Sequence, residues 1–588
     1  MNFVKRHWRE AVAALVVLAS RLAARPLSIW ELDEPQFALA VVEFDPTKYH
    51  PHPPGCPLFV GFGKVVHAFV ADPWLSLVIV SIITCTIGVV ALAAAFRRWL
   101  GDADLAVAGA LLFYLSAGMV VQTDLAMADA TTLMFIALFF YVTTFIVDGM
   151  TDRRALLLGV WAAAAIAARP QIAIPMLPAF AVALWFLPWR RRAIAAGAFA
   201  FVSLMCFLPL IEGTGGIPQF IAYQRKQAEY FVAHDAAQSR GNLPFAQIAL
   251  RFIAHPWGSK LVALPVFAAV ALGATAFVRR FDRRFVPLAV FCGTHLLFEL
   301  IAMDPADGVR YTLPAMILIA LVAAFGFEVL GRVAQFRAMP WVAVAVIAAL
   351  SWIYARPVIA ARTGQPSAPA AAAAYANQHF TPDTVILYDL AHHPFADYLL
   401  PRFRRMPIDA GLRAYYDHPE VPLVLYVDGG SQARDGIVFG WPDSDAYRKL
   451  TRNVYRQATL DPVFPSERYL PLDGVYALER TVAGAEWRWL TKEASIRLPR
   501  AHTASAELRF GLSPDVPYAA NRIRLRVNGI EAGEVSVPKD GATSTTIALP
   551  PGDVVIAISS ELSFAPATVL GNQDPRVLAV QLIRIDQK

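Results

Sequence analysis

The chain contains few cysteines and few charged residues for its length. Its 588 residues include 4 cysteines and 17% charged residues, against 57% hydrophobic residues. No two cysteines form a C-x-x-C pair, which argues against both a zinc ribbon and a disulfide framework. A Walker loop and a strand followed by G-x-G-x-x-G are absent too, so the sequence supports neither ATP hydrolysis nor a Rossmann nucleotide site. So little charge also excludes a set of ordinary soluble domains.

The basic residues are arranged as in a membrane protein. The formal net charge is +6, and the arginines occur in short clusters between apolar runs. Such clusters are typical of cytoplasmic loops, and no nucleic-acid partner is expected. With a mean hydropathy of +0.46, the sequence predicts a protein that crosses a membrane many times.

About 20 apolar residues cross the hydrocarbon core of a bilayer, and about eleven apolar runs are candidates for such spans. The first run is interpreted as a retained span with a cytoplasmic N-terminus, because no cleavage site precedes Arg21 and Arg25. Counting from it puts every later arginine cluster in the cytoplasm. The segment 57–70 is short and contains Lys64 and His67, so we interpret it as an interfacial or re-entrant helix. The predicted spans are 8–29, 74–96, 105–121, 130–147, 155–168, 172–188, 193–211, 260–278, 285–302, 312–330 and 340–355.

The loops on the predicted outer side carry the residues suited to chemistry. They contain acids, histidines, glutamine, lysine and tyrosine, whereas the cytoplasmic loops contain little besides arginine. We therefore expect a multi-pass protein of the cytoplasmic (inner) membrane that works at its outer, periplasmic or extracellular face. The outer loops are 30–73, 122–129, 169–171, 212–259 and 303–311, with everything after about residue 356.

The predicted fold class is an α-helical polytopic membrane domain followed by an exported α/β domain and a β-sandwich. The membrane domain covers residues 1–355, and a linker with a small α/β domain covers 356–484. From 485 to 588 the apolar residues alternate with period two, and turns such as Asn528-Gly529 separate the strands, which is typical of a β-sandwich.

Three acids stand together in the first outer loop. Glu31, Asp33 and Glu34 follow the first span directly. Asp33 is expected to cap the helix that begins there, which is a purely structural role. Carboxylates crowded beside a low-dielectric surface also acquire raised pKa values and act as bases. A catalytic or metal-binding role for Asp33 is the first functional hypothesis.

The other outer loops supply further candidates. His50 and His52 lie two residues apart in a proline-rich segment, where a metal site and a plain turn are both open interpretations. Arg310 and Lys226 are cations on the outer side, as a phosphate ligand requires. The remaining polar candidates at the mouths of spans are Asp124, Asp129, Arg169, Gln171, His255 and Tyr311.

Together these motifs resemble the GT-C integral-membrane glycosyltransferases, and in particular the branch with protein O-mannosyltransferases, aminoarabinose transferases and rhizobial core-sugar transferases. The resemblance rests on Asp33-Glu34, on the His-Pro-Pro-Gly-x-Pro-Leu segment from His52 to Leu58, on Arg169-Pro170 and on Arg310-Tyr311-x-x-Pro314. It covers residues 1–355. It implies a polyprenyl-phosphate sugar as donor and membrane lipids as surroundings.

The resemblance also implies roles for the candidates. Asp33, and with it Glu34, would be the general base or the ligand of a divalent metal such as Mg or Mn. Lys226 and Arg310 would bind the donor phosphate, and Arg169 and Tyr311 are grouped with them. The substrate-pocket candidates are His50, His52, Asp124, Asp129, Gln171 and His255.

The expected function is therefore inverting transfer of a sugar to an envelope acceptor, whether lipid, glycan or protein. Two alternatives stay open. A transporter or flippase of an envelope lipid would use polar groups within the spans, where His295 and Glu299 share one helical face. A non-catalytic scaffold would bind polysaccharide through the β-sandwich.

Overall fold

The chain folds into two compact units. The structure is a computed structural model and describes residues 2–234, 236–237, 243–305, 308–433, 435–440, 443–451, 457–501, 503–571 and 574–588. One unit comprises Met1–Ser367 with Pro442–Val454, and the other comprises Ala368–Trp441 with Tyr455–Lys588. The helical unit therefore includes a short piece of chain whose neighbours in the sequence, on both sides, belong to the second unit.

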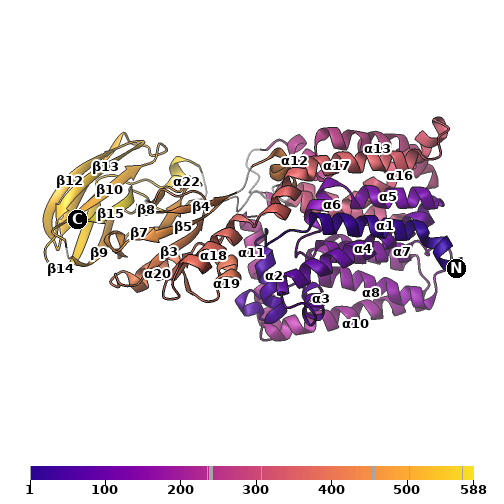
Figure 1. Ribbon diagram of the computed structural model, residues 1–588, viewed down its shortest axis with the longest axis horizontal. Coiled ribbons are helices and arrows are strands. Elements are labelled where there is room, and N and C mark those ends of the chain that lie inside the picture. The colour runs from indigo at the N-terminus through magenta and orange to yellow at the C-terminus, as the bar shows by residue number, and fades with distance from the viewer. Residues whose placement is uncertain are drawn as a thin grey trace. The chain divides into compact units, whose positions relative to one another are not determined.

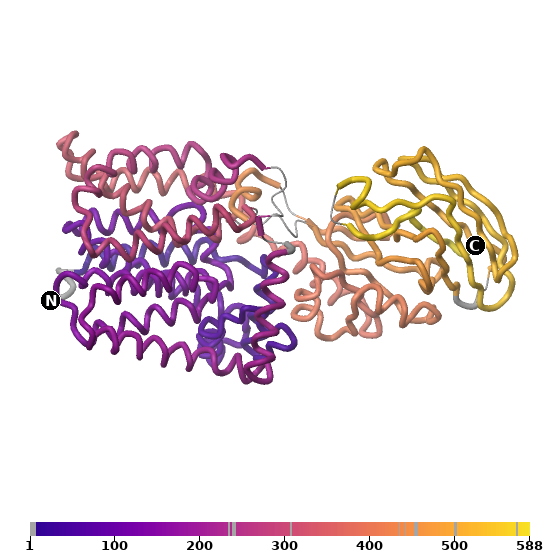
Figure 2. The backbone as a smooth tube through the Cα atoms, turned by 180° about the vertical axis from the view of Figure 1, so that it is seen from behind, coloured from indigo at the N-terminus to yellow at the C-terminus, as the bar shows by residue number. Residues whose placement is uncertain are grey.

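The helical unit is a bundle of long helices with short helices at one end. In Figure 1 the long helices lie side by side, and α2, α3, α11 and α12 gather at the end away from the N-terminus; Figure 2 gives the view from behind. The long helices are α1 (Asn2–Ala24), α4 (Pro73–Leu100), α5 (Ala103–Tyr114), α7 (Asp129–Thr143), α8 (Asp152–Ala168), α9 (Ala173–Trp185), α10 (Trp189–Gly213), α13 (Lys260–Arg280), α14 (Val286–Ala302), α16 (Met316–Val333) and α17 (Met339–Gly364). The remaining helices of the unit are α11 (Ile217–His234), of 18 residues, and the short helices α2 (Asp33–Val42), α3 (Pro57–His67), α6 (Ala117–Gln122), α12 (Phe245–Ile253), α15 (Gly308–Thr312) and α21 (Asp445–Leu450).

Each predicted apolar run falls largely on one helix, except 105–121, which covers α5 and α6 with a break between Tyr114 and Ala117. Within the described part of the chain, five helical segments are long and apolar enough to cross a membrane: Pro73–Leu100, Trp189–Gly213, Lys260–Arg280, Gly308–Val333 and Met339–His379. Four shorter apolar helices accompany them. A multi-pass helical membrane protein is thus confirmed, while the number of eleven spans stays a prediction.

The first and last long helices end away from the predicted ends of their spans. The first span was expected to reach residue 29, but α1 ends at Ala24, because Pro26 disfavours helical geometry at the residue before it. The last span was expected to end at 355, but α17 continues to Gly364 through Pro357. Hydropathy falls at Arg356, whereas the backbone remains helical.

The basic clusters gather at one end of the helices. Arg9 lies 2.6 Å from Asp104, and Arg97 lies 3.1 Å from Glu10, so the start of α1 meets the end of α4 and the start of α5. The indole of Trp341, at the start of α17, donates to Asp104 at 3.3 Å. This common end agrees with the predicted sidedness of the arginine clusters.

Small residues let the central helices approach closely. α16 packs against α13 and α4 packs against α7. A Cβ added at Gly326 of α16 would clash with the carbonyl oxygen of Ala269 in α13. Close backbone approach at small residues is a common way for helices to associate in a bilayer.

The second unit begins with an α/β part. Its five-stranded sheet has the order β2-β1-β3-β5-β4, in which β1 runs parallel to β2 and β3. Its strands are β1 (Val385–Tyr388), β2 (Arg404–Pro407), β3 (Leu423–Asp428), β4 (Ile437–Gly440) and β5 (Gln457–Val463), with helices α18 (Ala368–His379), α19 (His393–Leu399) and α20 (Ile408–Tyr415).

Two antiparallel five-stranded sheets follow and share one hydrophobic core. Their orders are β13-β10-β15-β8-β7 and β12-β11-β14-β9-β6. In β11 every second residue is buried, and Asn528-Gly529, both with positive φ, form the predicted turn to β12. The strands are β6 (Leu470–Pro471), β7 (Val475–Arg480), β8 (Glu486–Leu490), β9 (Glu493–Ala501), β10 (Ser505–Leu512), β11 (Ala520–Val527), β12 (Ile530–Pro538), β13 (Gly541–Ala548), β14 (Gly552–Ser560) and β15 (Val580–Gln587).

The units differ from the predicted domain borders. The second unit begins at Ala368 rather than 356, and residues 442–454 belong to the helical unit. β6 and β7 precede residue 485, yet they pair with β9 and β8. Strand pairing decides to which part of the fold a strand belongs, and the local amino-acid composition does not reveal that pairing.

Candidate functional site

Asp33 is the first residue of α2, and its carboxylate faces two other candidates. The prediction that Asp33 caps this helix was wrong, because Leu32 holds the N-cap position and no side chain caps the helix. Arg310 donates from Nη2 to Oδ2 of Asp33 at 3.4 Å, and Nε2 of His52 lies 3.7 Å from Oδ1. The Asp33 side chain keeps 24% of its surface exposed. It is thus available to a second molecule.

The proline-rich segment before α3 brings His52 to Asp33. The backbones of Asp45 and His50 bond to each other in both directions, at 2.7 and 3.0 Å, and so close a loop. The His52 ring then packs against Phe37 of α2, with ring centroids 5.1 Å apart. Burial and the nearby Arg310 lower the pKa of His52, partly opposed by Asp33. The imidazole is therefore neutral at neutral pH.

A tyrosine joins the two arginines of the site. Cζ of Arg169 lies 5.0 Å from the Tyr311 ring centroid, and Cζ of Arg310 lies 5.3 Å from it. Contacts of this kind between cation and ring face stabilise both partners. Nε2 of His295 lies 2.8 Å from the Tyr311 carbonyl oxygen and holds the backbone there. Glu299 lies 3.7 Å from the same nitrogen, so this predicted pair supports the site from α14.

Arg169 is extended at the end of α8 because Pro170 follows it. Its guanidinium forms a buried ion pair with Asp129, the first residue of α7. Asp33, Asp129, Arg169 and Arg310 are hereafter called the acid–guanidinium cluster.

Cys56 is a buried thiol near the acid–guanidinium cluster. Burial raises the pKa of Cys56 to about 12, and all four charges of the cluster also act on it. Sequence reasoning missed this residue, although its place within the His52–Leu58 motif was a signal. Cys56 is the N-cap residue of α3 and has a left-handed backbone, at φ +40°.

Glu34 lies beside Asp33 in the sequence but points into the protein. It is fully buried, and its two carboxylate oxygens accept four hydrogen bonds. The donors are the backbone N–H groups of Trp30, Glu31 and Ala126 and the indole of Trp74. Burial raises the pKa of Glu34, and these hydrogen bonds oppose the rise. The geometry indicates a structural anchor rather than the second catalytic acid of the prediction.

Asp124 belongs to a different buried group. Its carboxylate lies 3.6 Å from Arg362, and Arg362 lies 3.9 Å from Glu31. Burial raises the pKa of Asp124 to about 7, opposed by Arg362 and Arg21. Sequence reasoning missed both arginines, although Arg362 follows the last predicted span on the outer side, against the positive-inside tendency.

Three candidates lie apart from the cluster. Lys226 is exposed on α11 and sits over the Tyr49 ring at 5.0 Å, because α11 runs along the proline-rich segment and Tyr223 donates to the Pro51 carbonyl. Lys226 was expected to bind the donor phosphate together with Arg310 near Asp33, and no contact of Lys226 with either residue is found among the described residues. Gln171 is exposed next to Pro170. His255 lines a separate cavity.

The donor set near Asp33 does not fit a divalent metal. Among the residues that the structure describes, no three ligand-type side chains converge. Asp33 faces a guanidinium, and the oxygens of Glu34 are already occupied by N–H donors. Positive charge at this site comes from the arginines.

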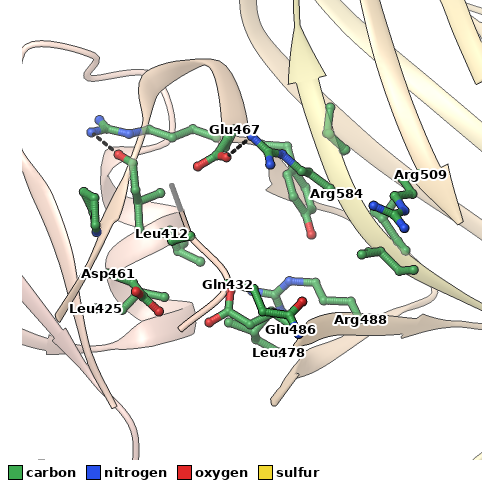
Figure 3. Close-up of a pocket in the computed structure, with 18 of the residues that line it drawn as sticks. Leu412, Leu425, Gln432, Asp461, Glu467, Leu478, Glu486, Arg488, Arg509 and Arg584 are labelled. Carbon is green, nitrogen blue, oxygen red and sulfur yellow. Dashed lines mark hydrogen bonds and ion pairs between the residues drawn. The ribbon is translucent and has the colours of Figure 1, made fainter. Parts of the chain in front are cut away.

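A second cavity, of about 250 Å³, lies within the second unit. In Figure 3 Glu467 points toward Arg584, and the two lie 2.7 Å apart. Asp461 and Glu486 both pair with Arg480. The carboxylates that line this cavity are thus neutralised by neighbouring arginines, which indicates a structural ion-pair network.

Comparison with known proteins supports the resemblance seen in the motifs. Residues 51–211 match the model of the dolichyl-phosphate-mannose-protein mannosyltransferase family. Among curated proteins, none matches the sequence of the chain. The family match includes His52, Cys56, Asp129 and Arg169.

Solved structures are similar in fold. ArnT from Cupriavidus metallidurans bound to undecaprenyl phosphate is 15% identical, with a TM-score of 0.52 over 78% of this chain and 98% of that chain. Its apo structure gives 0.51 with the same identity and coverage. The Archaeoglobus fulgidus oligosaccharyltransferase complex with Zn and sulfate is 10% identical, with a TM-score of 0.48 over 97% and 98% of the two chains. The chain thus shares the fold of ArnT over 78% of its length, and the predicted resemblance is confirmed at the level of the fold.

Proposed function

We propose that the protein transfers a sugar from a polyprenyl-phosphate-linked donor to a hydroxyl group of an envelope acceptor. The observation that carries this proposal is the contact between Asp33 and Arg310, which joins a carboxylate to a cation beside Arg169 and Tyr311. The undecaprenyl phosphate in the similar ArnT structure supports a lipid carrier of this kind.

Asp33 is the general base. It is partly exposed, and it can accept the proton of an acceptor hydroxyl as that oxygen attacks the sugar carbon. A positioned base contributes about 10²–10⁴-fold in rate. The neutral imidazole of His52 orients the carboxylate from the other side. Attack opposite the leaving phosphate inverts the configuration at the sugar carbon.

The two arginines bind the phosphate that departs. A guanidinium matches phosphate oxygens with two parallel N–H bonds, and its charge stabilises the negative charge that develops as the bond to the sugar breaks. Arg310 contacts Asp33 at 3.4 Å. A phosphate competes with the carboxylate for Arg310, so donor binding weakens this ion pair and leaves Asp33 to the acceptor.

We further propose an orientation in the membrane, which the positive-inside rule supports. The arginine clusters lie at the cytoplasmic face, and the acid–guanidinium cluster lies at the outer face of the cytoplasmic membrane. The lipid tail of the donor occupies the bilayer between helices. The second unit is then periplasmic or extracellular.

The test is donor consumption by purified protein in lipid nanodiscs, with a panel of polyprenyl-phosphate sugars and an envelope extract as acceptor source. Wild-type protein is expected to release polyprenyl phosphate from at least one donor. Asp33→Asn should lower that rate by about 10²–10⁴-fold. Asp45→Asn is the matched control, because Asp45 lies in the same loop but bonds to Thr47. Full turnover by Asp33→Asn would refute the base assignment.

A further inference from the structure

The helical unit contains a basic cavity of about 320 Å³ that is distinct from the acid–guanidinium cluster. It lies among residues of α12, the turn at His255, α15 and α21. The residues that matter for its chemistry are Arg251, His255, Val309, Asp445, Arg448 and Lys449.

Helix α21 is firmly attached to the helical unit. Ser444 caps it by accepting from the Tyr447 N–H at 3.0 Å. Gln122 donates to the carbonyl oxygen of Leu450 at 2.5 Å, and the hydroxyl of Tyr354 donates to Asp445 at 3.0 Å. These contacts hold Arg448 and Lys449, within the described residues 443–451, in a fixed position on the helical unit.

The cavity carries excess positive charge. Arg251, Arg448 and Lys449 line it, and Asp445 is the one carboxylate among its described lining residues. Asp445 pairs with Lys449 at 2.8 Å, and Asp443, which is not a lining residue, pairs with Arg448 at 2.8 Å, so the excess positive charge lies at Arg251. Burial, Lys449 and Arg251 lower the pKa of His255 to about 4, so its neutral ring adds hydrogen bonding without charge.

One short helix separates this cavity from Asp33. Val309 of α15 lines the cavity, and the next residue, Arg310, contacts Asp33 at 3.4 Å. A group bound in the cavity therefore contacts the same short helix, α15, that contacts the proposed base. The position suits a part of the acceptor that is not itself the reacting hydroxyl.

We propose that the basic cavity binds a phosphate group of the acceptor. Two arginines and a lysine are side chains that recognise phosphate, and the fork of a guanidinium matches phosphate oxygens with two parallel N–H bonds. The identity of the cavity as an acceptor subsite rests on the proposed function, while phosphate binding itself can be measured without turnover.

Lysine footprinting of the full chain tests the proposal. Protein in phosphatidylcholine nanodiscs is treated with acetic anhydride, and acetylation of Lys449 is measured by mass spectrometry with and without inorganic pyrophosphate. A parallel sample replaces the soluble anion with nanodiscs containing phosphatidic acid. Lys48, which pairs with Glu43 at 2.6 Å, serves as the internal reference.

We expect pyrophosphate or phosphatidic acid to protect Lys449, but not Lys48, from acetylation. Protection by pyrophosphate would indicate a soluble phosphate ligand, and protection by phosphatidic acid would indicate a lipid-borne one. Arg251→Gln should raise the pyrophosphate concentration for half-protection, or the phosphatidic acid content, about tenfold, as loss of one charge-assisted contact predicts. Arg448→Gln, at an exposed position, provides the same test if Arg251→Gln does not fold. Arg225→Gln on α11 is the matched control.

The outcomes separate this site from the proposed function. Asp33→Asn should lose transfer and keep the protection of Lys449. Protection that is absent with both probes, or that is equal in wild type, Arg251→Gln and Arg448→Gln, would overturn the cavity assignment and leave the transferase proposal intact.

Discussion

Nη2 of Arg310 lies 3.4 Å from Oδ2 of Asp33, across 277 residues of sequence. This contact brings the start of α2 to α15, at the end of the bundle away from the N-terminus. The Tyr311 ring contacts both Arg310 and Arg169, and Arg169 forms an ion pair with Asp129. Four helix ends thus place acids and guanidiniums around one point of the helical unit.

The first prediction concerns Arg310. Arg310→Gln should raise the KM for the donor and lower kcat, because the side chain both binds the phosphate and stabilises its developing charge. Loss of a hydrogen bond to a charged group costs about 1.5–3 kcal/mol, or roughly 10–150-fold in kcat/KM. Arg310→Lys should recover part of this loss, since it keeps the charge without the fork. Steady-state kinetics with varied donor provide the measurement.

Arg225→Gln is the control for the Arg310 variants. Arg225 is exposed and pairs with Glu229 on α11, away from the cluster. Its kinetics should match wild type. Equal donor KM values in wild type and Arg310→Gln would remove Arg310 from the phosphate site.

The second prediction separates Glu34 from Asp33. Glu34→Gln replaces one acceptor oxygen with an NH₂ donor that faces N–H groups, so buried donors lose their partners. Such losses cost about 1–3 kcal/mol for each unsatisfied group. Thermal unfolding in detergent should show a lower Tm for Glu34→Gln than for Glu43→Gln, an exposed acid at the end of the same helix. A wild-type Tm together with lost transfer would instead support the catalytic role for Glu34.

The third prediction uses the buried carboxylate of Asp124. Its pKa rises on folding from 3.8 to about 7, so the folded protein binds a proton more tightly than the unfolded chain. The corresponding stability is fully present below about pH 4 and is lost as the pH rises through about 7. Asp124→Asn should flatten this dependence between those values. Tm measured against pH for the two proteins gives the difference, and parallel curves would contradict the raised pKa.

The sequence predicted much of the helical unit and part of the site. Hydropathy located the helices, and the motifs identified Asp33, His52, Arg169 and Arg310, because charged residues at the ends of apolar runs are unusual enough to be noticed. It could not distinguish Asp33 from Glu34. Adjacent residues on a helix point in different directions, and which one faces the interior depends on Trp74 and Ala126 in distant segments.

Long-range pairing limited the prediction elsewhere. Arg362 reaches Asp124 only because α17 continues past Pro357, which hydropathy does not reveal. Likewise α21 lies in a stretch with the composition of the second unit, yet it packs on the helical unit through Leu450 and Asp445. Contacts of this kind depend on tertiary structure and leave no periodic signal.

The last prediction concerns metal dependence. Divalent metals bind to oxygen ligands that converge, and Asp33 converges instead with the guanidinium of Arg310 and the imidazole of His52. Transfer should therefore survive treatment with EDTA to within about twofold, and added Mg²⁺ or Mn²⁺ should not raise the rate, because the arginines supply the charge that a metal would bring. The measurement compares chelated, dialysed and metal-supplemented protein at one ionic strength. If EDTA abolished transfer and Mg²⁺ restored it, Asp33 would be better understood as a metal ligand that releases Arg310 when the ion binds.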